Sequence, residues 1–251
     1  MCICSCFFNF LENLKNQQNK HNFYIVNKAM SNVLTVVSYN IWFDTTLELE
    51  RMVSLVEMFN QHKPDVICLQ EVKPDIYELF INLLTDYRYH FPKKINKAYG
   101  CVTFSKYPIS RCLDYDYENS IMGRSLIITL IDYPLHHTTS NGVSVETFNI
   151  VIANSHFESV FKRTIINEAK VKQYELARDI LEKLYNIYHN VIFCSDTNVM
   201  PHEENEFNKQ FQENGWIDSW VVRGSQLNQY TYDTEYNIHL NLKLLKFKQQ
   251  P

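Results

Sequence analysis

Four short apolar runs, each followed at once by polar side chains, constrain the fold of this chain more than any other feature. They have the β-branched and aromatic composition of buried strands. Their ranges are Val33–Ile41, Val66–Leu69, Phe148–Asn154 and Val191–Cys194. A continuous apolar run is typical of a strand that is covered on both faces. The runs therefore predict strands that lie beneath other layers of structure.

Segments with helical periodicity lie between these strands. They are Leu47–Phe59, Asp75–Leu84 and Thr164–Tyr188. Gly100–Phe104 and Ser125–Ile131 have the composition of two further strands. Because no internal repeat or low-complexity linker interrupts the pattern, we predict one layered α/β domain over residues 33–251. Residues 1–32 are expected to form a disordered or poorly ordered extension.

Composition argues against several classes of protein. Only 5 glycines are present, and neither common glycine-rich nucleotide-binding motif occurs. The 7 cysteines include no C-x-x-C pair, which argues against structural zinc. Their odd number argues against a disulfide framework and indicates an intracellular, nuclear or cytoplasmic protein. No apolar run approaches the ~20 residues of a membrane span. The roles of Cys2, Cys4 and Cys6 and the oligomeric state are left open.

Polar side chains follow each of the four apolar runs. The segments are Ser38–Asn40, Gln70–Glu71, Asn154–Ser159 and Ser195–Asn198. Functional residues often lie where a rigid strand gives way to a loop. The sequence therefore predicts that these four strand ends form one site.

The residue types at the strand ends suit phosphodiester hydrolysis with a hard cation. Glu71 offers a carboxylate oxygen and Asn40 an amide oxygen for Mg²⁺, or for Mn²⁺, which accepts the same ligands. Asp196 is suited to orient or deprotonate the attacking water. Asn198 and His156 can donate hydrogen bonds to the phosphoryl oxygens, where charge grows in the transition state. One further hydroxyl donor is Ser159.

Each of these residues also has a structural explanation when it is taken alone. Asn40 could cap the segment after its strand, Glu71 could be a surface carboxylate, and His156 could be a hydrogen-bonded structural histidine. Asp196 and Asn198 also suit a turn, because both side chains bond to nearby backbone. Four strand ends with complementary groups, in this order, favour the functional interpretation for the set.

Five segments resemble the successive motifs of the endonuclease/exonuclease/phosphatase superfamily. They are SYNIW, PDVICLQEV, GCVTFSKYPIS, IANSHFES and VIFCSDTN, and the resemblance runs from about Val33 to Asp233. The resemblance implies a four-layer α-β-β-α sandwich, in which two mixed β-sheets pack together with helices outside. It also implies a hydrolase that uses Mg²⁺ (or Mn²⁺).

Within the superfamily, the chain resembles the 5′-tyrosyl-DNA phosphodiesterases, repair enzymes that remove topoisomerase II remnants from DNA 5′ ends. This narrower resemblance rests on DTN, HFES, MGRS at 122–125 and QYTYDT at 229–234. It implies that Arg124 lies close to the DNA, although a solvated charge at a strand end is an equal alternative. It also implies that Tyr232 provides a stacking surface. For the residues already named, it implies metal binding by Glu71 and Asn40, catalysis by Asp196, Asn198 and His156, and phosphate binding by Ser159.

Two departures from the family pattern keep the activity open. No closing Ser-Asp-His occurs before Pro251, so we expect the last strands of the domain to be missing and a neighbouring strand to be an exposed edge. Met200 stands where the tyrosyl branch has an arginine. Three hypotheses follow: a phosphodiesterase for DNA 5′ adducts, a catalytically inactive binding module with the same fold, or an enzyme of another branch of the superfamily.

Overall fold

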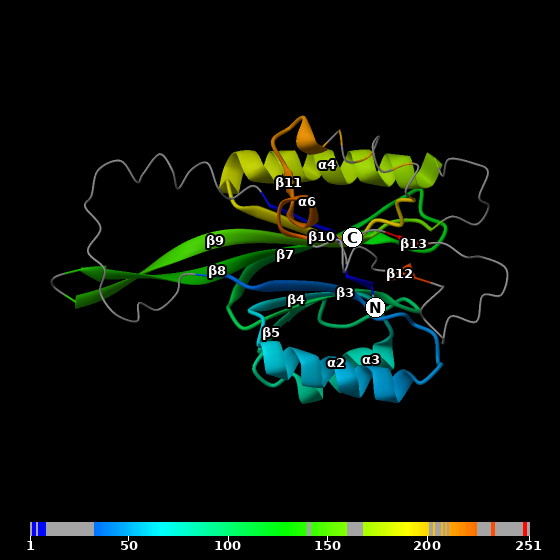
Figure 1. The fold of residues 1–251 in the computed structure, drawn as a ribbon, viewed down its shortest axis with the longest axis horizontal. Coiled ribbons are helices and arrows are strands. Elements are labelled where there is room, and N and C mark those ends of the chain that lie inside the picture. The colour runs from blue at the N-terminus through cyan, green and yellow to red at the C-terminus, as the bar shows by residue number, and fades with distance from the viewer. Residues whose placement is uncertain are drawn as a thin grey trace.

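Two β-sheets lie face to face, and helices cover their outer sides (Figure 1). One side carries α4 (Glu168–Tyr188), and the other carries α2 (Glu48–His62) and α3 (Pro74–Leu83). This order of layers confirms the predicted four-layer α-β-β-α sandwich. The computed structural model describes residues 2–3, 5–8, 33–139, 142–159, 168–200, 203, 207, 209, 211–224, 232–233 and 248–249.

The first sheet has five strands in the order β1-β3-β4-β6-β5. They are β1 (Cys2–Ile3), β3 (Val36–Asn40), β4 (Val66–Val72), β6 (Gly100–Ser105) and β5 (Tyr89–Phe91). Strands β3 and β4 are parallel, with α2 as the crossover between them, and Asn40 lies beside Gln70 in the register. The polar residues that end both strands therefore share one edge of the sheet.

The second sheet has six strands in the order β11-β2-β10-β9-β8-β7. They are β11 (Ile217–Asp218), β2 (Ser5–Phe8), β10 (Val191–Asp196), β9 (Gly142–His156), β8 (Ser125–Thr139) and β7 (Ile109–Asp116). The parallel pair β9 and β10 ends with His156 beside Asp196. After β11, the chain forms α6 (Ser219–Arg223). A separate antiparallel pair of strands follows, β12 (Tyr232–Asp233) and β13 (Lys248–Gln249).

Three hydrophobic clusters hold the four layers together. One packs α2 and α3 on the first sheet, and another packs α4 on the second. The third fills the space between the sheets with side chains from both. Its buried members are Val66, Cys68, Ile131, Tyr133, Ile150, Ile152, Ile192 and Cys194. Because each central strand is covered on both faces, its sequence is a continuous apolar run rather than an alternating one.

The first residues of the chain pair with both sheets. Cys2–Ile3 pairs antiparallel with β3, and Ser5–Phe8 lies between β10 and β11. These two strands extend the ladder of each sheet, and they lie within the segment 1–32 for which a poorly ordered extension was expected. Residues 1, 4 and 9–32 lie outside the described residues.

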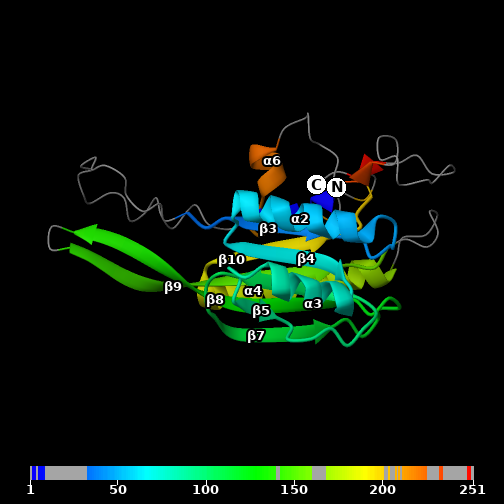
Figure 2. The ribbon, with the colours of Figure 1, turned by 90° about the horizontal axis from the view of Figure 1, so that it is seen from below.

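Strands β8 and β9 continue as a hairpin beyond the body of the molecule (Figures 1 and 2). They pair from Leu126 with Ser155 to Thr139 with Gly142. The side chains of residues 142–147 are exposed, which explains why the sequence predicted only the inner, apolar half of each strand. Among the described residues, no helix has both the length and the apolar character needed to cross a membrane.

A buried amide pair joins the two facing sheets. Gln70 Nε2 donates to Asn154 Oδ1 at 2.7 Å, and Asn154 Nδ2 donates to the backbone oxygens of Leu69 at 3.2 Å and Val102 at 3.0 Å. Both amide side chains are fully buried. Since buried polar groups in native proteins are almost always hydrogen-bonded, this pair fixes how the sheets align at the end where the polar residues gather.

Replacing Gln70 by Leu is expected to lower the free energy of unfolding by about 1–3 kcal/mol, because Asn154 Oδ1 loses its donor from Gln70 in a buried place. Urea denaturation measures the change. Gln61→Leu is the control, because Gln61 is exposed on α2 and its replacement is expected to cost less than about 0.5 kcal/mol. Equal stability of Gln70→Leu and the parent would show that the pair does not hold the sheets.

Candidate active site

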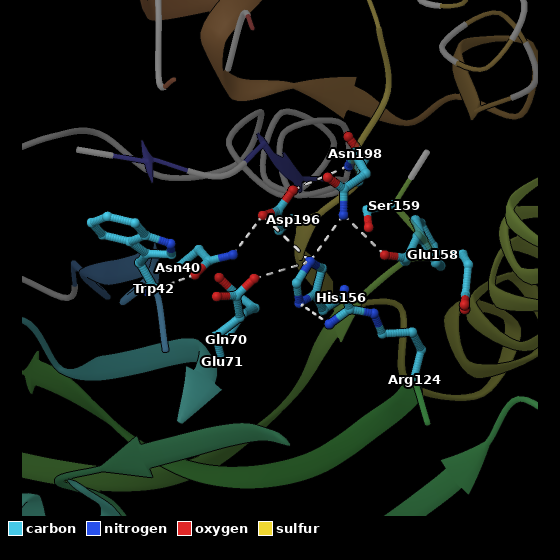
Figure 3. A network of polar contacts seen from close by, with 12 residues as sticks. Asn40, Trp42, Gln70, Glu71, Arg124, His156, Glu158, Ser159, Asp196 and Asn198 are labelled. Carbon is cyan, nitrogen blue, oxygen red and sulfur yellow. Dashed lines mark hydrogen bonds and ion pairs between the residues drawn. The ribbon is translucent and has the colours of Figure 1, made fainter. Parts of the chain in front are cut away.

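Polar side chains from both sheets meet where the parallel strands end (Figure 3). Asn40 ends β3 and Glu71 lies near the end of β4, while His156 ends β9 and Asp196 ends β10. The hydrogen bond from Asn40 Nδ2 to Asp196 Oδ2, 2.7 Å long, joins the two sheets. The structure therefore brings the four predicted strand ends together at one rim of the sandwich.

A β-bulge aims Glu71 at this rim. The register of β4 against β6 shifts between Leu69 and Val72, and Glu71 has a left-handed backbone with φ 61°. Such a conformation is strained for a residue other than glycine and is typical of functional sites. The Phe43 N–H donates to Glu71 Oε2 at 3.0 Å. Burial raises the pKa of Glu71, and the negative charge of Asp196 raises it further.

Two carboxylates face the same ring nitrogen of His156. Glu71 Oε1 lies 3.8 Å and Asp196 Oδ2 lies 3.6 Å from His156 Nε2, and the two carboxylate side chains are only 11% and 12% exposed. The two partly buried carboxylates repel each other, as the effect of Asp196 on the pKa of Glu71 shows, so a divalent cation bound by both would be stabilising. No group of three His, Cys, Asp or Glu side chains suited to a metal occurs within the described residues. A cation with few protein ligands and several waters, as Mg²⁺ prefers, fits this donor set.

The side chain of Asn40 is already engaged on both sides. Its Nδ2 group donates to Asp196, and its Oδ1 atom accepts a hydrogen bond of 2.8 Å from the Trp42 N–H. A carbonyl oxygen has two lone pairs, so one remains to bind a cation. Metal binding by Asn40 stays a prediction, while its contact with Asp196 shows a second role, which is to hold that carboxylate.

The protonation of His156 follows from its partners. Arg124 Nη1 lies 2.6 Å from His156 Nδ1, and a guanidinium can only donate, so Nδ1 must be the acceptor. Burial lowers the pKa of His156 to about 3, with a smaller opposing effect from Asp196, so the ring is neutral at physiological pH. Taken alone, the contact with Arg124 favours a neutral ring with its hydrogen on Nε2.

Asn198 places a second donor beside this histidine. Its Nδ2 atom lies 2.9 Å from His156 Nε2 and donates to the backbone oxygen of Phe157 at 3.0 Å. The backbone of Asn198 is left-handed, with φ 49°, and its N–H donates to Asp196 Oδ1 at 3.1 Å. Asn198 Nδ2 can only donate, so whether His156 Nε2 accepts from it or carries a hydrogen of its own depends on the tautomer of the ring.

Arg124 is buried, so the alternative of a solvated charge at a strand end is wrong. It is 5% exposed, and its guanidinium carbon lies 5.4 Å from the centre of the Tyr99 ring. Tyr99 stacks on Phe43, with ring centres 4.6 Å apart and an interplanar angle of 2°. Phe43 is 43% exposed, so this aromatic pair forms a partly exposed flat wall beside the rim. The sequence analysis did not find the pair, because the two rings come from distant loops.

Two other predicted residues are placed less clearly. The Ser159 hydroxyl lies 3.3 Å from Met122 Sδ, on the side of the rim where Glu158 and Asn198 are drawn in Figure 3. The backbone of Tyr232 lies in β12, and its side chain is outside the described part of the chain. The roles predicted for both residues in binding phosphate or DNA remain predictions.

A buried ion pair, which the sequence analysis did not find, contacts the backbone of Asn198. Lys170 Nζ contacts Glu203 Oε2 at 2.5 Å and donates to the backbone oxygen of Asn198 at 2.9 Å. Glu203 Oε2 also accepts from the Met200 N–H at 2.8 Å. Lys170 is fully buried. It lies four residues before Tyr174, on the apolar stripe of α4, and this position was the sequence signal that could have revealed its burial.

Comparisons with known proteins give the same fold and a family. The profile of the Endonuclease/Exonuclease/phosphatase family matches residues 37–226. No curated protein matches at a significant level. The crystal structure of TDP2 from C. elegans is similar with a TM-score of 0.68 and 21% identity, over 86% of this chain and 62% of that one. This chain therefore spans less than two thirds of the C. elegans structure.

Two further solved structures share the fold. TDP2 from D. rerio, complexed with single strand DNA product, has a TM-score of 0.66 and 20% identity, over 86% of this chain and 80% of that one. ANGEL2, a 2′,3′-cyclic phosphatase, has a TM-score of 0.51 and 17% identity, over 71% of this chain and 56% of that one. At these identities the likeness shows the arrangement of the strands and helices.

Proposed function

Since the chain belongs to the Endonuclease/Exonuclease/phosphatase family, we propose that it is a metal-dependent phosphodiesterase that acts on DNA 5′ ends bearing a tyrosyl adduct. Residues 33–251 form the catalytic domain of this proposal. Its wider role is DNA repair after damage by trapped topoisomerase II. The cofactor is Mg²⁺ or Mn²⁺, because the available ligands are oxygen atoms that both ions accept.

One observation supports hydrolysis of a phosphate ester above the others. Glu71 Oε1 and Asp196 Oδ2 lie within 4 Å of His156 Nε2. Asn198 Nδ2 lies 2.9 Å from the same ring nitrogen. Negative groups that suit a cation are thus next to N–H donors that suit an anion. A phosphate ester with its divalent cation presents both charges at once.

Each rim residue has its own role in the proposed hydrolysis. Glu71 and Asn40 would hold the divalent cation, which supplies Lewis-acid stabilisation of charge on the phosphoryl oxygens. Asp196 orients the attacking water or takes its proton, and it is itself held by Asn40 Nδ2 and the Asn198 N–H. The Nε2–H of His156 and the amide of Asn198 donate to the phosphoryl oxygens, where charge develops.

Three observations of different kinds support the choice of a DNA 5′ end. The HFES, DTN, MGRS and QYTYDT segments resemble those of the 5′-tyrosyl-DNA phosphodiesterases. The D. rerio TDP2 structure with the same fold holds a single strand DNA product. The partly exposed Phe43 and Tyr99 pair adds a flat aromatic surface, on which a base or a tyrosyl ring can stack.

The test is release of p-nitrophenol from the p-nitrophenyl ester of thymidine 5′-phosphate. We expect turnover with Mg²⁺ or Mn²⁺, loss of turnover in excess EDTA and recovery when Mg²⁺ is restored. A single-stranded oligonucleotide with a 5′-phosphotyrosyl end should compete in this assay. A 2′,3′-cyclic nucleotide should compete poorly.

The same assay decides among the alternatives. A folded, pure protein without any metal-dependent turnover contradicts the proposed activity and favours the binding module with the same fold. Stronger competition by the cyclic nucleotide, or by a phosphorylated inositol or sphingomyelin, would assign the chain to another branch of the family. Turnover that is equal with and without metal would overturn the proposed cofactor.

A further inference from the structure

One arginine on α2 binds four backbone carbonyl groups of a single loop. The loop is the segment 41–47 between β3 and α2, and we call it the β3–α2 loop. The Arg51 guanidinium donates to the backbone oxygens of Ile41 at 2.7 Å, Thr46 at 2.9 Å, Trp42 at 3.0 Å, and Asp44. A guanidinium is a rigid planar fork with five N–H groups, so it can fix several acceptors in one arrangement. Arg51 therefore organises the loop from the first turn of α2.

The β3–α2 loop has a backbone that needs such support. Trp42 and Leu47 are both left-handed, with φ 59° and 47°. Neither residue is glycine, and such conformations are costly and persist only where neighbouring groups hold them. The guanidinium carbon of Arg51 also lies 4.9 Å from the centre of the Trp42 ring, a favourable cation–π contact. Arg51 thus holds the loop through its backbone and through one of its side chains.

Two N–H groups of this loop bond to the side chains that are proposed to hold the cation. The Trp42 N–H donates to Asn40 Oδ1 at 2.8 Å, and the Phe43 N–H donates to Glu71 Oε2 at 3.0 Å. Each bond leaves the remaining oxygen lone pairs of its acceptor in a set direction. The loop therefore orients both of these side chains at the rim.

The same two peptide units carry the carbonyl groups that Arg51 Nη1 binds. The Ile41 oxygen and the Trp42 N–H belong to one unit, and the Trp42 oxygen and the Phe43 N–H belong to the next. A trans peptide is planar, with its C=O and N–H on opposite sides, so a group that fixes the oxygen also fixes the direction of the N–H. Arg51 Nη1 therefore directs both N–H groups across two rigid units.

We propose that Arg51 is a positioning residue that orients Glu71 and Asn40 for a divalent cation by fixing these two peptide units. The proposal rests on the proposed function in taking those two side chains as ligands of the cation. Arg51 acts on them through the loop. Loss of outer hydrogen bonds of this kind typically weakens metal binding about 10–100-fold.

The charge of Arg51 allows positioning to be separated from electrostatics. Burial lowers the pKa of Arg51, while nearby negative groups, including Glu48 and Glu71, act in the opposite sense. A positive charge near Glu71 opposes the binding of a cation there, so removing that charge alone would strengthen cation binding. Removing a positioning group would weaken it. The two effects on metal affinity therefore have opposite signs.

The experiment is a titration of the full chain with Mn²⁺, in which electron paramagnetic resonance counts the free ion. We expect Arg51→Met to bind Mn²⁺ about 10–100-fold more weakly than the parent, although it has lost a positive charge. Arg51→Lys keeps the charge but not the planar fork, and it should also bind at least about 10-fold more weakly. Arg88→Met is the control, because Arg88 is exposed in the loop before β5, and its affinity should stay within about twofold of the parent.

A folded Arg51→Met protein that binds Mn²⁺ as tightly as the parent, or more tightly, overturns the proposal. Amide hydrogen exchange, followed by NMR without metal, decides if the Arg51 variants do not fold. The Trp42 and Phe43 N–H groups of the parent should be protected from exchange, and rapid exchange of both would overturn the proposal as well. Failure of the proposed function looks different, since Mn²⁺ affinity would still depend on Arg51 while neither the parent nor any variant showed metal-dependent turnover.

Discussion

Glu71→Gln is expected to lower kcat/KM for the thymidine ester at least about 10²–10³-fold at saturating Mg²⁺. Glutamine has the same shape and still offers one oxygen to the Phe43 N–H. It cannot supply the negative charge that a divalent cation needs, and Asn40 offers only a neutral amide oxygen. The rate should therefore fall while the fold is kept, as circular dichroism and the unfolding midpoint would show.

The control for this change is Glu57→Gln on α2, where the carboxylate is exposed. It removes the same charge from a place away from the rim, so its kcat/KM should stay within about twofold of the parent. If Glu71→Gln is as active as Glu57→Gln, then Glu71 does not hold the cofactor. The assignment of the rim residues would have to be changed.

Lys170→Met is expected to lower the free energy of unfolding by about 3–5 kcal/mol, because it leaves Glu203 as an unpaired carboxylate in a buried place. Lys170 is fully buried, and burial lowers its pKa, with Glu203 acting in the opposite sense. The variant also removes the donor to the backbone oxygen of Asn198, so activity should fall even where the protein is folded. Urea denaturation at neutral pH measures the loss of stability.

Two further variants separate the ion pair from the helix. Lys172→Met changes an exposed lysine on α4 and should alter the free energy of unfolding by less than about 0.5 kcal/mol. The double variant Lys170→Met with Glu203→Leu removes both charges and should recover most of the lost stability. A double variant that is no more stable than Lys170→Met would show that the buried, unpaired charge of Glu203 is not the cause of the lost stability.

The buried centre of the fold could be predicted from the sequence, and its exposed parts could not. Strands β3, β4, β9 and β10 lie where the apolar runs predicted them, because a strand covered on both faces must be apolar throughout. β7 was missed, since most of its side chains are exposed and it is held by pairing with β8. The outer half of the β8–β9 hairpin was missed for the same reason.

The site shows a similar limit. Asn40, Glu71, His156, Asp196 and Asn198 were singled out because they follow apolar runs, and the structure brings them together. The burial of Arg124 and the pairing of Lys170 with Glu203 depend on contacts between distant segments. A sequence read alone gives no measure of such contacts.

Binding of Mn²⁺ followed by electron paramagnetic resonance tests whether the rim is a cation site at all. The free ion is counted as the protein is titrated, so neither substrate nor turnover is needed. We predict that the parent and Glu57→Gln bind Mn²⁺ equally, that excess Mg²⁺ displaces it, and that Glu71→Gln binds it at least about 10-fold more weakly. Equal binding by Glu71→Gln and the parent, or no binding by a folded parent, would contradict the site described here.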